Sequence, residues 1–348
     1  MTFNLEELVR PNILGLKSYS SARSEFAGAA DVFLDANENA FGSPAGDDFN
    51  RYPDPLQGAL KTRVAEMNLV TPSQIFVGNG SDEAIDLLFR IFCEPGRDEC
   101  VICPPTYGMY RVSADINDVS VNEVRLTDDF QLDVPSILRT ISPRTKLIFV
   151  CSPNNPTGNL MKRDDVIRLA REFDGIVVVD EAYIHFADQP SMIGEIERER
   201  NIVVLQTFSK AWGMAGLRVG LAFGSEPLID LMNRVKPPYN VSSISQQAVH
   251  AALGDVTKVD QWITNILAER ERLTQSVASF SFVKTIYRSD ANFILVKTAD
   301  ATAIYRHLID HKIVVRDRSS VELCENCLRI TVGTELENDR LIKALESY

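Results

Sequence analysis

Short apolar runs alternate with segments of helical periodicity through the middle of the chain. Runs of continuous apolar, β-branched character predict strands that are buried on both faces. They cover residues 99–103, 145–151, 175–180, 201–207 and 218–223. Between them, apolar residues at helical spacing predict helices near 82–92, 107–116 and 163–174. This alternation is typical of an α/β fold, and we expect three layers built on a mostly parallel sheet.

The pattern changes after about residue 240. A helical stretch covers 244–279, with a break expected at Gly254 and Asp255, and the elements after it no longer alternate strictly. These are strands at 282–287 and 292–297, a helix at 301–311, two more short strands and a final helix at 335–347. We therefore expect a large domain at 31–243 and a smaller α+β domain at 244–348. An N-terminal arm, 1–30, shows no core element and is expected to lean on the small domain or on a partner subunit.

Charge and composition narrow the class of function. The chain carries 36 Lys and Arg against 48 Asp and Glu, a net charge of −12, which disfavours nucleic-acid and membrane binding. A run of about 18 apolar residues, which a membrane helix requires, does not occur. Residues 1–7 lack the basic and apolar regions of a signal peptide. We expect a cytoplasmic protein that acts on small molecules.

Two cysteine pairs, Cys100/Cys103 and Cys324/Cys327, have the CxxC spacing of a zinc site. In the predicted strand 99–103, however, residues three apart point to opposite faces, so Cys100 and Cys103 cannot share a metal. We interpret all four as reduced thiols and expect no metal. His307 and His311 lie four apart on a predicted helix without the acidic partner of an HExxH motif, which favours a plain helix surface.

Polar segments follow the predicted strands, where ligands gather in α/β sheets. Residues 78–83 open a helix, and free N–H groups at a helix N-terminus bind phosphate. An ordinary helix cap at Ser81 or Asp82 explains this segment equally well. Residues 152–158 present Asn154 and Asn155 on a proline- and glycine-containing loop, which suits either an amide donor to a ligand or a tight turn.

Two charged residues follow the next strands. Asp180 ends a buried strand, and a buried carboxylate needs a positive partner, such as the pyridinium nitrogen of a cofactor. Lys210 follows another buried strand, and a desolvated lysine becomes a nucleophile toward an aldehyde. Ser209 and Arg218 are suited to hold a phosphate. Together, in this order, these elements point to a pyridoxal-phosphate enzyme whose cofactor forms a Schiff base with Lys210.

The motif set resembles that of the fold-type I pyridoxal-phosphate-dependent aminotransferases, and within them it is similar to the histidinol-phosphate aminotransferases. The similarity runs from Leu34 to Gly333. It is carried by the segments 50–54, 103–110, 152–158 and 180–183 and by Ser209 and Lys210. Trp212 departs from the pattern, since an aliphatic residue or phenylalanine is commoner there. This departure concerns packing near the cofactor lysine and leaves the Ser-Lys pair intact.

The resemblance implies a large domain that binds pyridoxal phosphate. Lys210 would bind the cofactor and move a proton between substrate and cofactor, while Asp180 would pair with the ring nitrogen. Asn155 and Tyr183 would contact the ring hydroxyl oxygen, and Tyr107 would stack on the ring. The implied phosphate-binding residues are Ser81, Asp82, Ser209 and Arg218.

The same resemblance implies a homodimer with shared active sites, in which Tyr52 reaches the cofactor phosphate of the neighbouring subunit. Arg329 matches the arginine that binds a substrate carboxylate, and Arg316 and Tyr19 match the residues that bind a substrate phosphate. The alternative for Arg316 is a place in a solvated charge cluster, because charged residues flank it. The implied reaction, in histidine biosynthesis, converts L-glutamate and imidazole-acetol phosphate to 2-oxoglutarate and L-histidinol phosphate.

Other functions of pyridoxal-phosphate proteins stay open to different degrees. An aromatic-amino-acid aminotransferase would need no phosphate site, so Arg316 and Tyr19 argue against it. A decarboxylase of a phosphorylated amino acid shares most of the motifs, and the choice depends on which substrate bond stands perpendicular to the ring. A cofactor-sensing regulator would need an added DNA-binding module, for which this acidic chain has no room.

Overall fold

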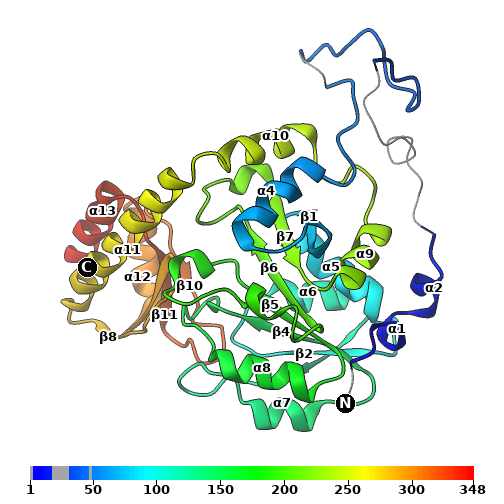
Figure 1. Ribbon diagram of the computed structural model, residues 1–348. Helices are drawn as coiled ribbons and strands as arrows, with labels where there is room; N and C mark the ends of the chain where they lie inside the picture. Colours follow the sequence, from blue (N-terminus) through cyan, green and yellow to red (C-terminus); the bar gives the residue numbers. More distant parts are fainter. Residues whose placement is uncertain (1–2, 18–30, 47–48) are drawn as a thin grey trace.

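The computed structural model describes residues 3–17, 31–46 and 49–348. Its centre is a seven-stranded sheet of order β1-β7-β6-β5-β4-β2-β3 (Figure 1). Strand β7 runs antiparallel to both of its neighbours, and the β6-β5-β4-β2-β3 part is parallel. The strands are β1 (Ile75–Asn79), β2 (Glu99–Ile102), β3 (Ser120–Glu123), β4 (Thr145–Cys151), β5 (Ile176–Asp180), β6 (Ile202–Thr207) and β7 (Val219–Phe223). The predicted mostly parallel sheet is confirmed.

Helices cover both faces of this sheet and form two separate apolar cores. One core includes α5 (Ser81–Phe92), α6 (Met109–Ile116) and α9 (Glu226–Val235). The other includes α4 (Gly58–Asn68), α7 (Val134–Thr140), α8 (Arg163–Glu172) and α10 (Ser243–Ala252). The predicted three-layer α/β fold is therefore confirmed.

Each central strand alternates its side chains between the two cores. In β5, Ile176 and Val178 enter one core, while Val177 and Val179 enter the other. This explains the continuous apolar runs, because both faces are covered. The same alternation places Cys100 and Cys103 in different cores, as the strand pattern predicts.

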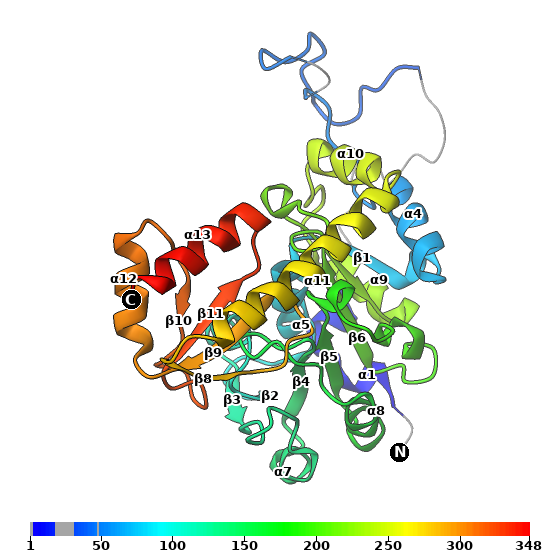
Figure 2. The same ribbon diagram turned by 90° about the vertical axis from the view of Figure 1, so that its left-hand side faces the viewer.

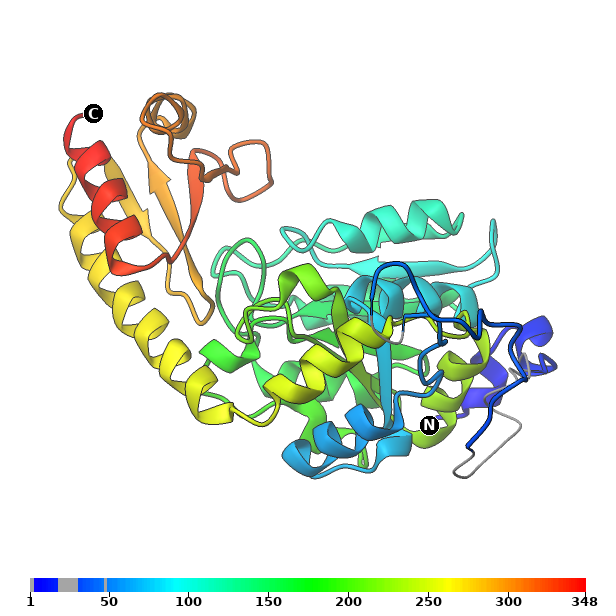
Figure 3. The same ribbon diagram turned by 90° about the horizontal axis from the view of Figure 1, so that it is seen from above.

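A second, antiparallel sheet of order β10-β11-β9-β8 follows in the chain. Its elements are α11 (Val256–Ala278), β8 (Val283–Ile286), β9 (Phe293–Thr298), α12 (Ala301–Asp310), β10 (Arg316–Asp317), β11 (Cys327–Thr331) and α13 (Glu335–Glu346). Helix α11 joins the two sheets (Figures 2 and 3), with Val259 in a core of the first and Leu273 in the core of the second. Strand β9 lies between a core of the large sheet and the core of the small one. Phe293 and Leu295 enter the first, and Ile294 and Val296 enter the second.

The described part of the N-terminal segment, residues 3–17, lies on the large domain. Two short helices, α1 (Leu5–Leu8) and α2 (Pro11–Leu14), pack on the large sheet's helices rather than on the C-terminal elements. Val9 is buried there, and the Arg10 backbone N–H donates to the Ile91 carbonyl at 3.0 Å. Four-residue helices have too few apolar positions to show a period, so the sequence pattern misses them.

The described residues between 31 and 50 stand away from the body of the molecule (Figure 1). Several of their large apolar side chains are exposed, among them Leu34 and Phe41. Within the described ranges, no helix has the length and apolar character needed to cross a membrane.

Candidate active site

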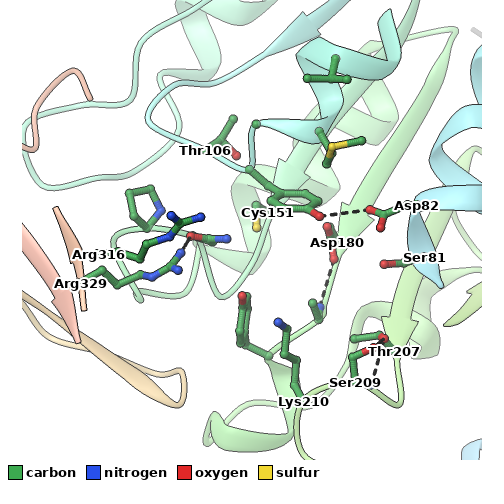
Figure 4. Close-up of a pocket in the computed structure, with 18 of the residues that line it drawn as sticks. Ser81, Asp82, Thr106, Cys151, Asp180, Thr207, Ser209, Lys210, Arg316 and Arg329 are labelled. Atoms are coloured by element: carbon green, nitrogen blue, oxygen red, sulfur yellow. Dashed lines mark hydrogen bonds between the residues drawn. The ribbon is translucent and has the colours of Figure 1, made fainter. Parts of the chain in front are cut away.

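A cavity of about 540 Å³ opens where β4, β5 and β6 end, and the second sheet contributes part of its wall (Figure 4). Tyr19 falls outside the described residues, and of the other predicted site residues all but Tyr52 line this cavity. The predicted residues on the wall are Ser81, Asp82, Tyr107, Asn155, Asp180, Tyr183, Ser209, Lys210, Arg218, Arg316 and Arg329. The parallel sheet thus gathers residues that are far apart in the sequence.

One end of the cavity is the N-terminus of α5. Ser81 and Asp82 are the first residues of this twelve-residue helix, and Gly80 precedes it with a φ of +77°. A β-carbon on Gly220 of β7 would lie 2.2 Å from the Ser81 backbone nitrogen, so only glycine allows this approach. The free N–H groups and the helix dipole favour an anion at this end.

Side chains from the loops after β6 complete this end. The Ser209 hydroxyl lies 2.9 Å from the Thr207 hydroxyl, which fixes its position beside the cavity. Arg218 has a left-handed backbone (φ +54°), and its guanidinium lies 3.5 Å from the Asp82 carboxylate. N–H groups, a hydroxyl and a guanidinium together fit the phosphate of a cofactor.

Lys210 lies in the turn that follows β6. Its side chain is open to the cavity, yet the surrounding protein lowers its pKa by removing water, and the positive Arg329 adds to this effect. Its Nζ lies 5.5 Å from the centre of the Tyr183 ring. Lowering the pKa increases the share of neutral amine, which is the nucleophilic form.

Asp180 ends β5 and is 3 % exposed. Its Oδ1 accepts from the Ala182 N–H at 3.1 Å, and its Oδ2 accepts from the Tyr110 hydroxyl at 2.7 Å. Burial raises the pKa of Asp180 to about 6. A carboxylate held this deep gains most from a cationic ring nitrogen, which is what pyridoxal phosphate presents.

Two tyrosines line the space between Asp180 and the second sheet. The Tyr107 hydroxyl donates to Asp82 Oδ1 at 3.1 Å. The Tyr183 ring meets Phe293 of β9 edge-on, with the ring centres 5.2 Å apart. Burial raises the pKa of both tyrosines, so each stays neutral and keeps its hydroxyl proton as a donor.

The two asparagines of the 152–158 loop differ in position. Asn154 is wholly buried and holds the loop together, since its amide donates to the Pro105 carbonyl (2.9 Å) and to the Thr157 hydroxyl (2.7 Å). Asn154 therefore does not line the cavity. Asn155 does face the cavity, and its side-chain oxygen accepts a hydrogen bond from Arg329.

Three arginines lie on the wall that the second sheet provides. Arg316 pairs directly opposite Arg329 in the β10-β11 ladder, so their side chains share a face. Arg318, two residues after Arg316, also lines the cavity, and its Nε is enclosed without a hydrogen-bond partner among the described residues. The sequence interpretation gave no role to Arg318, although the two-residue period of strands was a signal for it.

The acidic neighbour of these arginines does not neutralise them. The Asp317 carboxylate accepts from the Thr302 hydroxyl at 2.8 Å and from the Ser319 N–H at 2.8 Å. It therefore belongs to the other side of the strand. The wall formed by Arg316, Arg318 and Arg329 is strongly positive and suits an anionic substrate group.

Comparison with known proteins identifies the family. The family described as "Aminotransferase class I and II" matches residues 23–345. The chain belongs to this family. It is 51 % identical over 348 residues to histidinol-phosphate aminotransferase from Cytophaga hutchinsonii, covering 100 % of both chains. It is 50 % identical over 345 residues to the enzyme of that name from Bacteroides thetaiotaomicron, covering 99 % of both.

A solved structure shares this architecture. Histidinol-phosphate aminotransferase from Sinorhizobium meliloti, in complex with pyridoxal-5'-phosphate, superposes with a TM-score of 0.79 at 25 % identity. The superposition covers 90 % of each chain. The fold of this aminotransferase is therefore that of the fold-type I enzymes.

Two aromatic residues of this aminotransferase lie outside the main cavity. Tyr52 is half exposed, stacks on Tyr239 at 4.6 Å, and lines a neighbouring cavity of about 770 Å³ that shares Arg218 with the first. Trp212 packs edge-on against Phe208 and lines a separate cavity of about 190 Å³. The departure at Trp212 therefore affects packing on the side of the lysine turn away from the main cavity.

Proposed function

We propose that this aminotransferase transfers an amino group from L-glutamate to imidazole-acetol phosphate, giving 2-oxoglutarate and L-histidinol phosphate in histidine biosynthesis. Pyridoxal phosphate is the cofactor. The observation that carries the proposal is one cavity with a lysine, a buried carboxylate and a helix N-terminus on one side and three arginines on the other. Relatives about half identical over the full length carry the name of this activity.

Each residue near the cofactor has its own role in the proposed reaction. The bound cofactor supplies an electron-accepting ring that stabilises negative charge developing at the substrate Cα. Lys210 Nζ would hold the cofactor and would carry the proton that leaves the substrate Cα. Asp180 would hold the ring nitrogen in its protonated form, and Asn155 and Tyr183 would donate to the ring oxygen. The positions of the four side chains on one cavity wall support these assignments.

The substrate groups bind at the arginine wall. Arg329 receives the carboxylate of glutamate, and Arg316 serves the phosphate of the second substrate, with Tyr19 completing this site. A single carboxylate accepts one guanidinium fork, so Arg316, Arg318 and Arg329 together exceed what it requires. A phosphate dianion offers more acceptor positions and more charge. The arginine wall therefore favours the phosphorylated substrate over an aromatic amino acid.

A homodimer with shared active sites accounts for the exposed apolar residues near the N-terminus. Val32, Leu34 and Phe41 are 71 %, 86 % and 102 % exposed on a segment that stands away from the body (Figure 1). Burying these side chains against a second copy of the chain would remove apolar surface from water, which is favourable. Tyr52 follows this segment and lies outside its own subunit's cavity, as a residue that serves the partner's site would.

We further propose that the enzyme works in the cytoplasm as a soluble protein without nucleic-acid or membrane partners. The net charge of −12 supports this proposal, because an acidic surface is repelled by nucleic acid and by anionic membranes.

An amino-acceptor screen tests the reaction. L-glutamate is the donor, the acceptors are imidazole-acetol phosphate, its dephosphorylated form and phenylpyruvate, and 2-oxoglutarate is measured. We expect kcat/KM for the phosphorylated acceptor to exceed that for the other two by at least about a hundredfold, the value of one or two charge-assisted contacts. Equal use of phenylpyruvate would reassign the enzyme to aromatic amino acids, and CO₂ release from a phosphorylated amino acid would make it a decarboxylase. Lys210→Ala is the blank.

A further inference from the structure

Tyr110 has no role in the proposed reaction, yet it contacts the residue that faces the cofactor ring. Its side chain is 0 % exposed and lies behind the cavity wall rather than on it. Its hydroxyl donates to Asp180 Oδ2 at 2.7 Å. A phenol buried without a partner is unfavourable, so this contact fixes both the phenol and the carboxylate.

The Tyr110 ring is held on two sides. It stacks on Phe149 of β4, with ring centres 4.8 Å apart and planes 18° from parallel. It meets Tyr107, which lies just before α6, edge-on with ring centres 5.5 Å apart. The hydroxyl therefore has one accessible position. Since the Ala182 N–H holds Oδ1, donors from two elements fix both oxygens of Asp180.

The groups around Asp180 shift the pKa of its carboxyl in different directions. Burial and the nearby Asp82 carboxylate both raise the pKa of Asp180, while Lys210 lowers it. Cys151 lies opposite Asp180 in β4 and is neutral, because burial raises the pKa of its thiol. The hydrogen bond from Tyr110 is the largest effect that opposes burial and so favours the ionised carboxylate.

We propose that Tyr110 is a positioning residue for the cofactor: its hydroxyl aims Asp180 at the ring nitrogen and keeps the carboxylate ionised there. Tyr110 acts only through Asp180, so its contribution exists only for a ring that has this nitrogen. The proposal rests on the pairing of Asp180 with the ring nitrogen in the proposed function.

Tyr110→Phe tests the proposal, because it removes the hydroxyl and keeps the ring packing. Cofactor-free wild type and variant are titrated calorimetrically with pyridoxal phosphate and with its 1-deaza analogue, in which carbon replaces the ring nitrogen. We expect Tyr110→Phe to bind pyridoxal phosphate about tenfold more weakly, the scale of a lost charge-assisted hydrogen bond. Affinity for the 1-deaza analogue should stay within about twofold of wild type, since that ring makes no ion pair with Asp180.

Tyr287→Phe is the matched control, because its ring packs on Phe130 at 5.0 Å and does not line the cavity. It should bind both compounds as wild type does. Equal weakening of both compounds in Tyr110→Phe would mean that Tyr110 only supports packing and would overturn the proposal. An unchanged affinity for pyridoxal phosphate would overturn it as well.

A second comparison separates an effect of Tyr110 that passes through Asp180 from one that does not. In an Asp180→Asn background the buried charge is gone, and adding Tyr110→Phe should leave pyridoxal phosphate affinity unchanged within about twofold. A further loss there would show that Tyr110 acts independently of Asp180. A wild type that does not bind pyridoxal phosphate would contradict the proposed function itself. A wild type that does not discriminate between the two compounds would contradict only the Asp180 pairing and, with it, the role of Tyr110.

Discussion

Desolvation acts in opposite directions on two charged residues of one cavity. It lowers the pKa of Lys210 and raises that of Asp180, so both are shifted toward their neutral forms. Lys61 shows that a lowered pKa is not sufficient for function. Its pKa is lowered to about 8 by burial, but it does not line the cavity. Position on the cavity wall, together with desolvation, is the reason we propose Lys210 rather than Lys61 as the cofactor lysine.

Lys210→Ala should lose the covalent link to the cofactor and nearly all turnover, about a thousandfold or more, because both the nucleophile and the proton carrier are removed. The purified wild type should be yellow. Borohydride reduction followed by peptide mapping checks the assignment, with Lys61 and Lys236 as the buried lysines for comparison. A reduced adduct on either of these would refute it.

Asp180→Asn should bind the cofactor but lose the charge that keeps the ring nitrogen protonated. Because electron withdrawal matters in the transition state, kcat should fall more than KM rises. One pKa unit corresponds to about 1.4 kcal/mol, so a loss of one or two units of electrostatic support means about tenfold to a hundredfold in kcat. Steady-state kinetics at measured cofactor occupancy check this, and an unaltered kcat would leave Asp180 a structural role only.

At the level of elements, the β10-β11 ladder decides which arginines act together. The register sets Arg316 opposite Arg329, and the strand period turns Asp317 to the other side. One wall of the cavity thereby gains positive charge from residues thirteen positions apart in the chain. A shift of the register by one residue would put Asp317 there instead.

Arg329→Ala should slow both half-reactions, whereas Arg316→Ala should slow mainly the one with the phosphorylated substrate. The expected loss is about 1.5–3 kcal/mol, roughly tenfold to a hundredfold in kcat/KM for each affected half. Single-turnover kinetics measure the halves separately, with exposed Arg306 replaced by alanine as the control. If Arg316→Ala slows the glutamate half equally, the phosphate assignment of Arg316 fails.

At the level of the whole molecule, one cavity depends on two sheets and, in our proposal, on two subunits. Helix α11 ties the sheets together, since its first turns pack in a core of the large sheet and its last turns in that of the small one. This connection keeps the arginine wall in the same cavity as Lys210 and Asp180. The described part of the arm carries the exposed apolar residues that a second copy would cover.

Mixing Tyr52→Ala and Lys210→Ala subunits tests the shared site. Each variant alone should be nearly inactive, and hybrid dimers hold one site that carries neither change. Random exchange in a symmetric dimer should restore about a quarter of wild-type activity. Activity that stays at the level of the single variants, after mass spectrometry has shown hybrid dimers, would make Tyr52 an ordinary exposed tyrosine.

The sequence by itself determined the layered fold and the residues at its strand ends. Apolar runs specify strands buried on both faces, and the residues that follow them reach the sheet edge whatever the rest of the chain does, which is why Asp180 and Lys210 are found without a structure. Contacts between distant elements carry no such local signal. Only the tertiary structure decided that Tyr110 donates to Asp180, seventy residues away, that Arg318 joins the arginine wall, and that Asn154 is buried. It also placed α1 and α2 on the large sheet's helices, because four-residue helices gain their stability from packing and not from a pattern of their own.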